Sequence, residues 1–139
     1  MKDLIIENRK ELDEEMLSLI QHAKIGEEFD VSADYKFIAK YKDKLVGIIV
    51  YRVVTAGTNK YPRFIHIIFH PDYKRSKVAY VFARETEKIL ARDGYIQTLA
   101  YIKQEKAHMR DLAEKFGYEK YAEDDEGKFY CKTIGGRDV

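Results

Sequence analysis

Three basic side chains lie close together in a short polar stretch between an apolar run and a helical pattern. Lys74, Arg75 and Lys77 follow residues 64–69, which are apolar except for one histidine. That run is rich in β-branched and aromatic residues and predicts a buried strand. A strand, a basic loop and a helix N-terminus together can bind phosphate, because the first N–H groups of a helix lack partners and its dipole is positive there. The alternative is a solvated basic turn.

Two side chains are candidates for moving protons. His66 has an ordinary pKa near 6.5 and could act as a base. Strand alternation, however, places it opposite Arg63 and Ile65, so a hydrogen-bonded structural histidine is the favoured interpretation unless a bulge shifts the register. Tyr101 could act as a general acid, although a tyrosine in a central strand is more often part of a core. Cys131 stands alone, which argues against a disulfide framework or a thiolate metal site.

The composition is that of an ordinary globular protein. The 139 residues, 45% hydrophobic and 35% charged, are enough for one domain covering residues 1–139. A net charge of +1 gives little electrostatic drive toward nucleic acid or a membrane surface, so we expect neither as a partner. Without a signal-like N-terminus or a long apolar run, the chain is expected to be cytoplasmic.

The first half of the chain predicts a strand, a helix and a hairpin. Residues 4–6 form a short strand, and apolar residues from Leu12 to Ala23 recur with helical spacing up to a closing Gly26. Strands at 35–41 and 44–54 are so closely linked that they predict an antiparallel hairpin. Residues 55–60 predict a turn or loop.

The second half predicts a parallel crossover followed by another hairpin. A helix beginning near Ser76 and ending near Gly94 separates the strand at 64–69 from one at 95–103, and such a crossover makes the two strands parallel. A helix at 109–116 and a terminal hairpin of 118–123 with 128–134 complete the chain. The fold class is therefore α/β (α+β), a mixed central sheet of about seven strands with three to four helices.

Four local matches, in this order and spacing, resemble the GNAT superfamily of acyl-CoA N-acyltransferases. Lys44–Gly47 is similar to the start of the family's third strand, and Phe69–Tyr73 to the end of its fourth. Residues 76–94 resemble its long helix. Residues 107–118, AHMRDLAEKFGY, are similar to the helix that ends in Gly and an aromatic residue.

The resemblance implies acetyl-CoA as co-substrate and no metal. The family's pattern assigns the pantetheine to the strand backbone at Ile67, Ile68 and Phe69. It assigns the pyrophosphate to the loop and helix start, at Lys74, Arg75, Ser76, Lys77, Val78 and Ala79. The acceptor would be an amine of a small molecule or a protein. The terminal hairpin also offers a sheet edge through which two copies of the chain could pair as a homodimer.

Several positions depart from the family pattern. Lys77 replaces the glycine that lets backbone amides approach the phosphates. Ala113 stands where many members carry a proton-donating tyrosine, and Arg63 and Tyr101 stand where members carry a carboxylate. The first hypothesis is direct acetyl transfer from acetyl-CoA to a primary amine. The alternative is a catalytically impaired GNAT-fold protein that binds coenzyme A or another protein.

Overall fold

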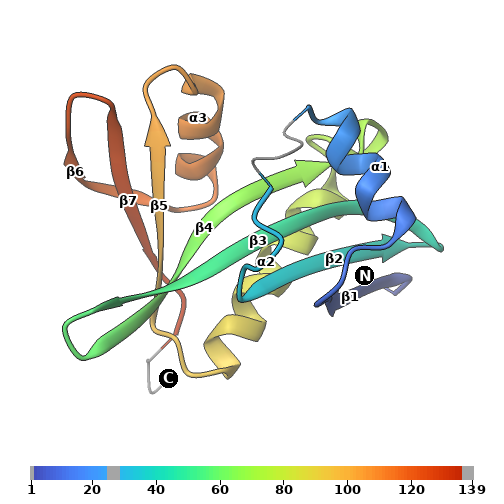
Figure 1. Ribbon diagram of the computed structural model, residues 1–139, viewed down its shortest axis with the longest axis horizontal. Coiled ribbons are helices and arrows are strands. Elements are labelled where there is room, and N and C mark those ends of the chain that lie inside the picture. Colours follow the sequence, from blue (N-terminus) through green and yellow to red (C-terminus); the bar gives the residue numbers. More distant parts are fainter. Residues whose placement is uncertain (1, 25–28, 136–139) are drawn as a thin grey trace. The chain divides into compact units, whose positions relative to one another are not determined.

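The computed structural model describes residues 2–24 and 29–135 and shows strands and helices in the predicted order (Figure 1). Within these residues lie seven strands, three α-helices and one 3-10 helix. In chain order they are β1 (Leu4–Asn8), α1 (Glu14–His22), β2 (Tyr35–Tyr41), β3 (Lys44–Ala56), β4 (Asn59–Phe69), η2 (Pro71–Tyr73), α2 (Lys77–Arg92), β5 (Gln97–Lys103), α3 (Ala107–Lys115), β6 (Glu119–Glu123) and β7 (Gly127–Thr133).

The strands form one mixed sheet in the order β1-β2-β3-β4-β5-β7-β6. The pairs β1–β2, β2–β3, β5–β7 and β6–β7 are antiparallel. Strands β4 and β5 are parallel, with Arg63 opposite Leu99 and Phe64 opposite Ala100. The mixed α/β sheet and its parallel crossover are therefore confirmed.

The predicted loop at 55–60 is wrong in extent. Strand β3 continues to Ala56 and β4 begins at Asn59, so only Gly57 and Thr58 separate the two strands. Gly57 has a φ of 66°, a left-handed conformation that glycine adopts without steric cost. The closing Gly26 predicted for the first helix lies outside the described residues.

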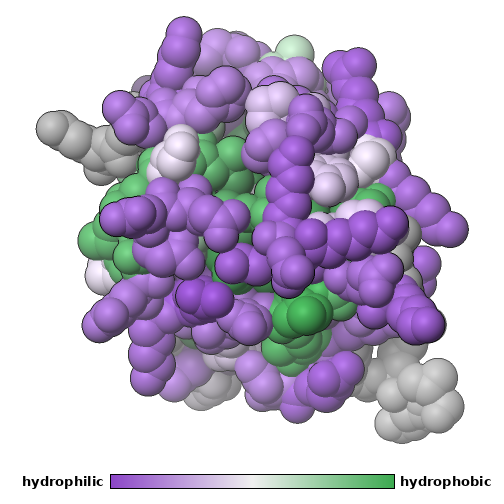
Figure 2. Space-filling model, turned by 90° about the vertical axis from the view of Figure 1, so that its right-hand side faces the viewer, coloured by the Kyte–Doolittle hydropathy of each residue, from purple (hydrophilic) through white to green (hydrophobic). Residues whose placement is uncertain are grey.

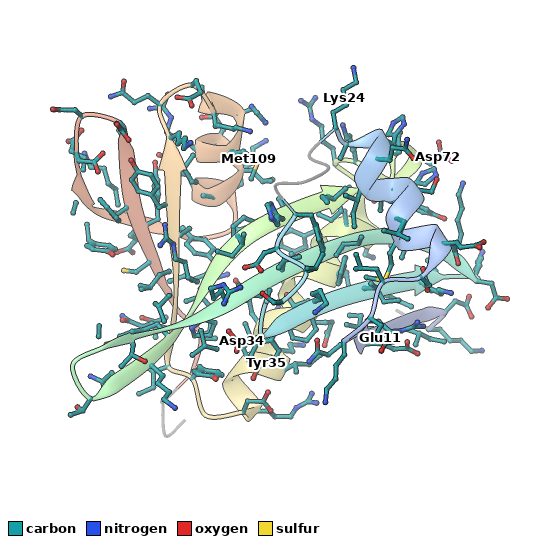
Figure 3. All side chains as sticks on the ribbon, in the orientation of Figure 1. Glu11, Lys24, Asp34, Tyr35, Asp72 and Met109 are labelled. Carbon is teal, nitrogen blue, oxygen red and sulfur yellow. The ribbon has the colours of Figure 1, made fainter. Side chains whose placement is uncertain are left out.

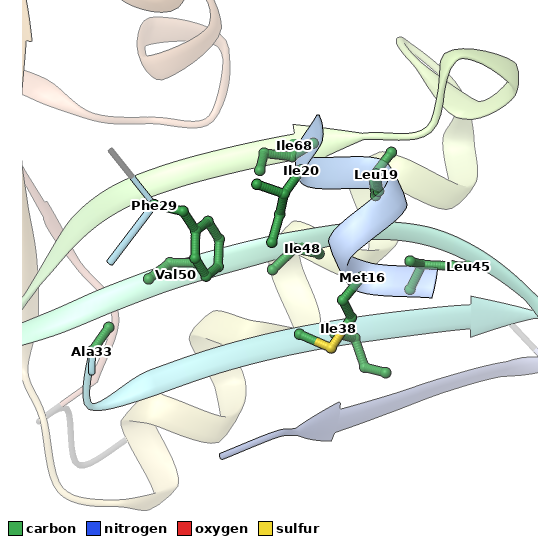
Figure 4. Close-up of a cluster of buried hydrophobic side chains, with 10 residues drawn as sticks. All are labelled: Met16, Leu19, Ile20, Phe29, Ala33, Ile38, Leu45, Ile48, Val50 and Ile68. Atoms are coloured by element: carbon green, nitrogen blue, oxygen red, sulfur yellow. The ribbon is translucent and has the colours of Figure 1, made fainter. Parts of the chain in front are cut away.

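The chain divides into two compact units, and each is described by itself. Unit 1 comprises Met1–Arg52 and Ile65–Ile89, and unit 2 comprises Val53–Phe64 and Leu90–Val139. In unit 1, α1 begins where the Asp13 carboxylate accepts the Met16 N–H at 2.9 Å, an N-cap that satisfies an otherwise unpaired donor. Its apolar side packs with residues of β2, β3 and β4 (Figure 4); the buried cluster consists of Met16, Leu19, Ile20, Phe29, Ala33, Ile38, Leu45, Ile48, Val50 and Ile68.

Unit 2 has its own core between α3 and one side of the β5–β7 pair. Ala100 and Ile102 of β5 and Tyr130 of β7 are buried together with Ala113 of α3 and Tyr118. Beneath the helix, the hydroxyls of Thr98 and Tyr118 share a hydrogen bond of 2.8 Å. This pairing matters because an unpaired buried hydroxyl destabilises the fold.

Hydrophilic residues cover most of one face of the molecule (Figure 2). Figure 2 views the right-hand side of Figure 1, where hydrophilic groups dominate and hydrophobic groups show between them. No helix of the described segments is both long and apolar enough to cross a membrane.

Candidate functional site

An ion pair joins the turn between β4 and α2 to the β2–β3 hairpin. Lys44 Nζ lies 2.5 Å from Asp72 Oδ2 (Asp72 is labelled in Figure 3). The hydrogen bond from Lys44, followed by its charge, lowers the pKa of the Asp72 carboxyl. Both side chains are about half exposed, so this pair orients the turn more than it stabilises the fold.

Aromatic side chains support the same turn. The Tyr73 ring packs edge-on against Tyr41 at a centroid distance of 6.3 Å, and Lys44 Nζ lies 5.7 Å from its centroid. His70 Nδ1 accepts the Asp72 N–H at 3.1 Å. No sequence signal indicated these contacts, because Tyr41 and Lys44 lie about thirty positions before the residues they support.

Backbone N–H groups in the turn are available for a ligand. Those of Lys74, Arg75, Lys77 and Val78 have no hydrogen-bond partner among the described residues. Arg75 has a φ of 61°, which reverses the chain direction just before α2. Four free donors at a helix N-terminus, with three basic side chains exposed beside them, fit an anionic phosphate group.

The other two amides of the predicted segment are used internally. Ser76 caps α2, since its Oγ accepts the Ala79 N–H at 3.1 Å, and its own N–H bonds to the Tyr73 carbonyl at 3.1 Å. Lys77, at the position of the family's glycine, is exposed and keeps its N–H free. The substitution therefore adds a charge without removing the amide from the turn.

The end of β4 lies close to a glycine of β3. A Cβ placed on Gly47 would be 2.5 Å from the Ile68 carbonyl oxygen and 2.9 Å from the Phe69 ring. Ile67 and Phe69 are half-buried and Ile68 is buried. The His70 N–H donates to the Val46 carbonyl at 2.7 Å, which fixes the point where the strand enters the turn.

His66 contacts the segment that follows α1. Its ring stacks on Phe29 at 5.3 Å, and its Nε2 accepts the Asp30 N–H at 3.3 Å. Asp30 in turn forms a bidentate pair with Arg52, at 2.7 and 2.6 Å, which lowers the pKa of the Asp30 carboxyl.

His66 and Ile68 both lie next to the buried cluster of unit 1, as strand alternation predicts, because the Phe29 ring that stacks on His66 belongs to that cluster. Ile65 packs against the same cluster, although alternation places it on the opposite face.

Tyr101 lies in unit 2, next to an acidic loop. Its hydroxyl donates to Asp124 Oδ1 at 3.0 Å, and its ring lies 4.6 Å from that of Phe129. Partial burial, followed by the hydrogen bond to Asp124 and nearby negative charge, raises the pKa of Tyr101. Tyr101 thus keeps its proton, and directs it to Asp124.

The remaining family positions carry no acid or base. Ala113 is buried in α3, and Arg63 is a half-buried residue of β4. Within the described residues there is also no group of three or more His, Cys, Asp or Glu side chains that could hold a metal ion.

A mixed sheet with a parallel β4–β5 pair, joined through a basic turn and a helix, is the arrangement expected of the GNAT fold class. The sequence matches the acetyltransferase (GNAT) family over residues 3–118. The chain therefore belongs to that family. No curated protein sequence matches it.

Solved structures share this fold at low identity. An acetyltransferase from Bacillus subtilis in complex with CoA is 14% identical in sequence, with a TM-score of 0.73. The match covers 94% of this chain and 99% of the Bacillus chain. A GNAT family acetyltransferase from Elizabethkingia anophelis with acetyl-CoA bound is 10% identical in sequence, with a TM-score of 0.72. The match covers 96% of this chain and 100% of the Elizabethkingia chain. The PaiA N-acetyltransferase from Thermoplasma acidophilum, in complex with coenzyme A, is 18% identical with a TM-score of 0.59; the match covers 70% of this chain and 59% of the PaiA chain.

Proposed function

We propose that this protein transfers an acetyl group from acetyl-CoA to a primary amine. The observation that carries the proposal is the turn before α2, whose four free N–H groups and three exposed basic side chains suit a diphosphate. The residues that would bind it are those predicted from the sequence, Lys74 to Ala79. Among them, Ser76 and Ala79 shape the helix start, and the other four supply donors.

The strand before the turn would hold the pantetheine arm. Backbone groups of Ile67, Ile68 and Phe69 are proposed as its partners, at the place where Gly47 allows β4 to approach β3. CoA and acetyl-CoA complexes are known for structures of the same fold, which supports this choice of co-substrate.

In the reaction, an uncharged amine attacks the carbonyl carbon of the thioester. A C–N bond forms, the C–S bond breaks, and the coenzyme leaves as a thiolate. A backbone N–H of β4 is proposed to stabilise the developing oxyanion, and the amine proton passes to water or to a base. No metal and no covalent intermediate on the protein are required.

His66 and Tyr101 remain the proposed catalytic side chains, as base and acid respectively. Each already has a partner: His66 Nε2 accepts from the Asp30 N–H, and Tyr101 donates to Asp124. These contacts favour the second candidate function, a GNAT-fold protein that binds coenzyme A with impaired catalysis. In that case the acetyl group would stay on the bound coenzyme.

Thermal unfolding with acetyl-CoA, desulfo-CoA and ATP tests the binding step, followed by detection of free CoA thiol with a panel of amines. Ligand at 100 times its dissociation constant stabilises a protein by ~2.7 kcal/mol. Stabilisation with thiol release supports transfer, whereas stabilisation without release supports the binding function. An unchanged unfolding temperature at millimolar acetyl-CoA contradicts both.

Lys77→Glu tests the site itself. Placing a negative charge beside the phosphates should weaken acetyl-CoA binding by about 1–3 kcal/mol, roughly 5- to 150-fold. Lys10→Glu is the matched control, because Lys10 is exposed in unit 1 and forms no ion pair within the described part of the chain. Equal affinity in the two variants would show that the turn is not the phosphate site.

A further inference from the structure

One side of the sheet in unit 2 carries a row of aromatic rings. Tyr101 of β5 lies next to Phe129 of β7, and Phe129 lies 6.1 Å from Tyr121 of β6. We call these three rings the aromatic face. The core of unit 2 lies on the other side, where α3 covers Ala100 and Tyr130. Tyr121 is 56% exposed, and every residue of β6 is exposed.

The strand register separates the charges between the two sides of this sheet. Residues directly opposite each other in neighbouring strands share a side. Lys128 pairs with Ile102, Lys132 with Thr98, and Lys120 with Tyr130. Because Thr98, Ile102 and Tyr130 are buried residues of the α3 side, these three lysines lie on that side as well.

Acidic groups predominate next to the aromatic face. Glu119 lies opposite Cys131, and Cys131 lies opposite Leu99. Leu99 is two residues from Tyr101, and Cys131 is two residues from Phe129. Strand alternation therefore places Leu99, Cys131 and Glu119 on the aromatic side. The charges of Asp124, Glu126 and Glu105 all act at the Tyr101 hydroxyl. Two basic residues share this side by the same rule: Lys103 of β5, and Arg63 of β4, which lies opposite Leu99.

Several of these carboxylates are available to bind a cation. Asp124 Oδ1 accepts the Glu126 and Gly127 N–H groups at 2.9 Å each, along with the Tyr101 hydroxyl. Its Oδ2 has no partner in the described residues, and within the same residues Asp125 and Glu126 form no ion pair. Hydrogen bonds from the loop backbone, Glu126 first, lower the pKa of Asp124, so this carboxyl stays charged.

We propose that the aromatic face is a docking surface for an extended basic peptide segment. Lysine or arginine side chains of the peptide would lie over the rings of Tyr101, Phe129 and Tyr121, where the ring faces attract cations. The carboxylates at Asp124, Asp125 and Glu126 supply the complementary charge. This function goes beyond the proposed acetyl transfer and does not depend on binding of coenzyme A.

The exposure of this surface favours a peptide over a small polyamine as the ligand. A small ligand binds well when a concave site buries most of its surface. The aromatic face instead runs across three strands and ends on β6, which is exposed throughout. An extended chain can cover such a surface along its length, because each residue adds contact area.

The test is fluorescence anisotropy of the full chain, without coenzyme A, with a labelled peptide of alternating lysine and serine. We expect saturable binding that weakens as salt rises, and no binding of the glutamate–serine counterpart. Tyr121→Ser should weaken binding about two- to five-fold by removing an exposed ring. Asp125→Asn with Glu126→Gln should weaken it to a similar extent. Lys103→Ser should bind at least as tightly as the parent protein.

The matched control is Glu11→Gln with Glu14→Gln, which removes two exposed carboxylates from unit 1. Affinity in this control should equal that of the parent protein. The proposal is overturned if the lysine peptide does not bind, if the two double variants weaken binding equally, or if spermine binds while the peptide does not. Because no coenzyme is present, none of these outcomes depends on the acetyltransferase function.

Discussion

The two proposed recognition regions, the turn before α2 and the terminal hairpin, offer a ligand different parts of the chain. In the turn, the free donors are backbone N–H groups, and the surrounding side chains are basic. In the hairpin region, the available groups are aromatic rings and carboxylates of side chains. A backbone site tolerates substitution as long as the local geometry is kept, and Lys77, at the position of the family's glycine, keeps its N–H free within the described residues. A site built from side chains changes its chemistry with each substitution.

The largest effects on stability should come from substituting two glycines, one next to each region. A Cβ on Gly47 would be 2.5 Å from the Ile68 carbonyl oxygen, and a Cβ on Gly127 would be 2.5 Å from the Ile102 carbonyl oxygen and 2.9 Å from the Tyr101 hydroxyl. Real Cβ atoms do not approach backbone so closely, so each alanine forces a strand to shift. We expect Gly47→Ala and Gly127→Ala each to lower the free energy of unfolding by about 1–3 kcal/mol in urea denaturation.

The two alanine variants should also separate the regions. Gly47→Ala should weaken acetyl-CoA binding and leave the Tyr101 resonances unchanged. Gly127→Ala should displace the Tyr101 ring and leave acetyl-CoA affinity within two-fold, roughly 0.4 kcal/mol. The opposite pattern of effects would mean that the functions are assigned to the wrong regions.

Two buried threonines give a second, paired comparison. The Thr98 hydroxyl bonds to the Tyr118 hydroxyl, a side-chain partner, whereas the Thr86 hydroxyl donates to the Ala83 carbonyl of its own helix. Tyr118→Phe leaves a buried hydroxyl without its partner, so we expect a loss of about 1–3 kcal/mol.

Thr86→Val is the companion variant, and it should cost less than about 1 kcal/mol. The Ala83 carbonyl lies inside α2 and accepts a helical N–H whether or not the hydroxyl is present. Chemical denaturation measures the free energy of unfolding of both variants. A larger loss of stability for Thr86→Val than for Tyr118→Phe would show that the type of hydrogen-bond partner does not decide the cost.

The smallest effects concern two exposed carboxyls whose pKa values are lowered for different reasons. For Asp72 the main cause is the hydrogen bond from the Lys44 side chain, and for Asp124 it is the backbone N–H of Glu126. Lys44→Met should therefore return the pKa of Asp72 toward the ordinary value near 3.9, while Tyr101→Phe should raise that of Asp124 only slightly.

The sign of the pH dependence is the same for both groups. A carboxyl with a lowered folded-state pKa stabilises the fold fully above its unfolded pKa, about 3.9, and this contribution is lost as the pH falls through the folded value. NMR titration of the two carboxyls between pH 6 and 2 measures both shifts. A large change at Asp124 in Tyr101→Phe would show that the side chain, not the loop backbone, sets its pKa.

The sequence predicted the elements well because their signals are local. The apolar periodicity of α1 and the polar breaks between strands lie within a few residues, so the β2–β3 and β6–β7 hairpins and the β4–β5 crossover followed from the pattern. The extent of β3 and β4 was missed, because Gly57 and Thr58 form a much tighter turn than the polar composition of 55–60 indicated. His66 was predicted to be a hydrogen-bonded histidine, and its bond to the Asp30 N–H agrees with that interpretation.

Site residues were predictable only where the backbone determines them. The segment Lys74 to Ala79 was predicted as a phosphate site from its position between a strand and a helix, and it stays a prediction; the structure adds that Ser76 caps the helix. The partners that restrain side chains come from distant parts of the sequence: Asp124 for Tyr101, Asp30 for His66, and Lys44 for Asp72. No local pattern encodes such pairs, because they depend on how strands are placed side by side.

The most direct test of the central claim is an amide NMR titration of the full chain with coenzyme A, with pantetheine as the ligand that lacks phosphates. The account predicts that coenzyme A shifts the N–H signals of Lys74, Arg75, Lys77 and Val78 more than those of Ser76 and Ala79, whose N–H groups are already bonded. Pantetheine should leave the four signals in place. Signals of the turn that stay unchanged while coenzyme A binds elsewhere would contradict the assignment of the phosphate site.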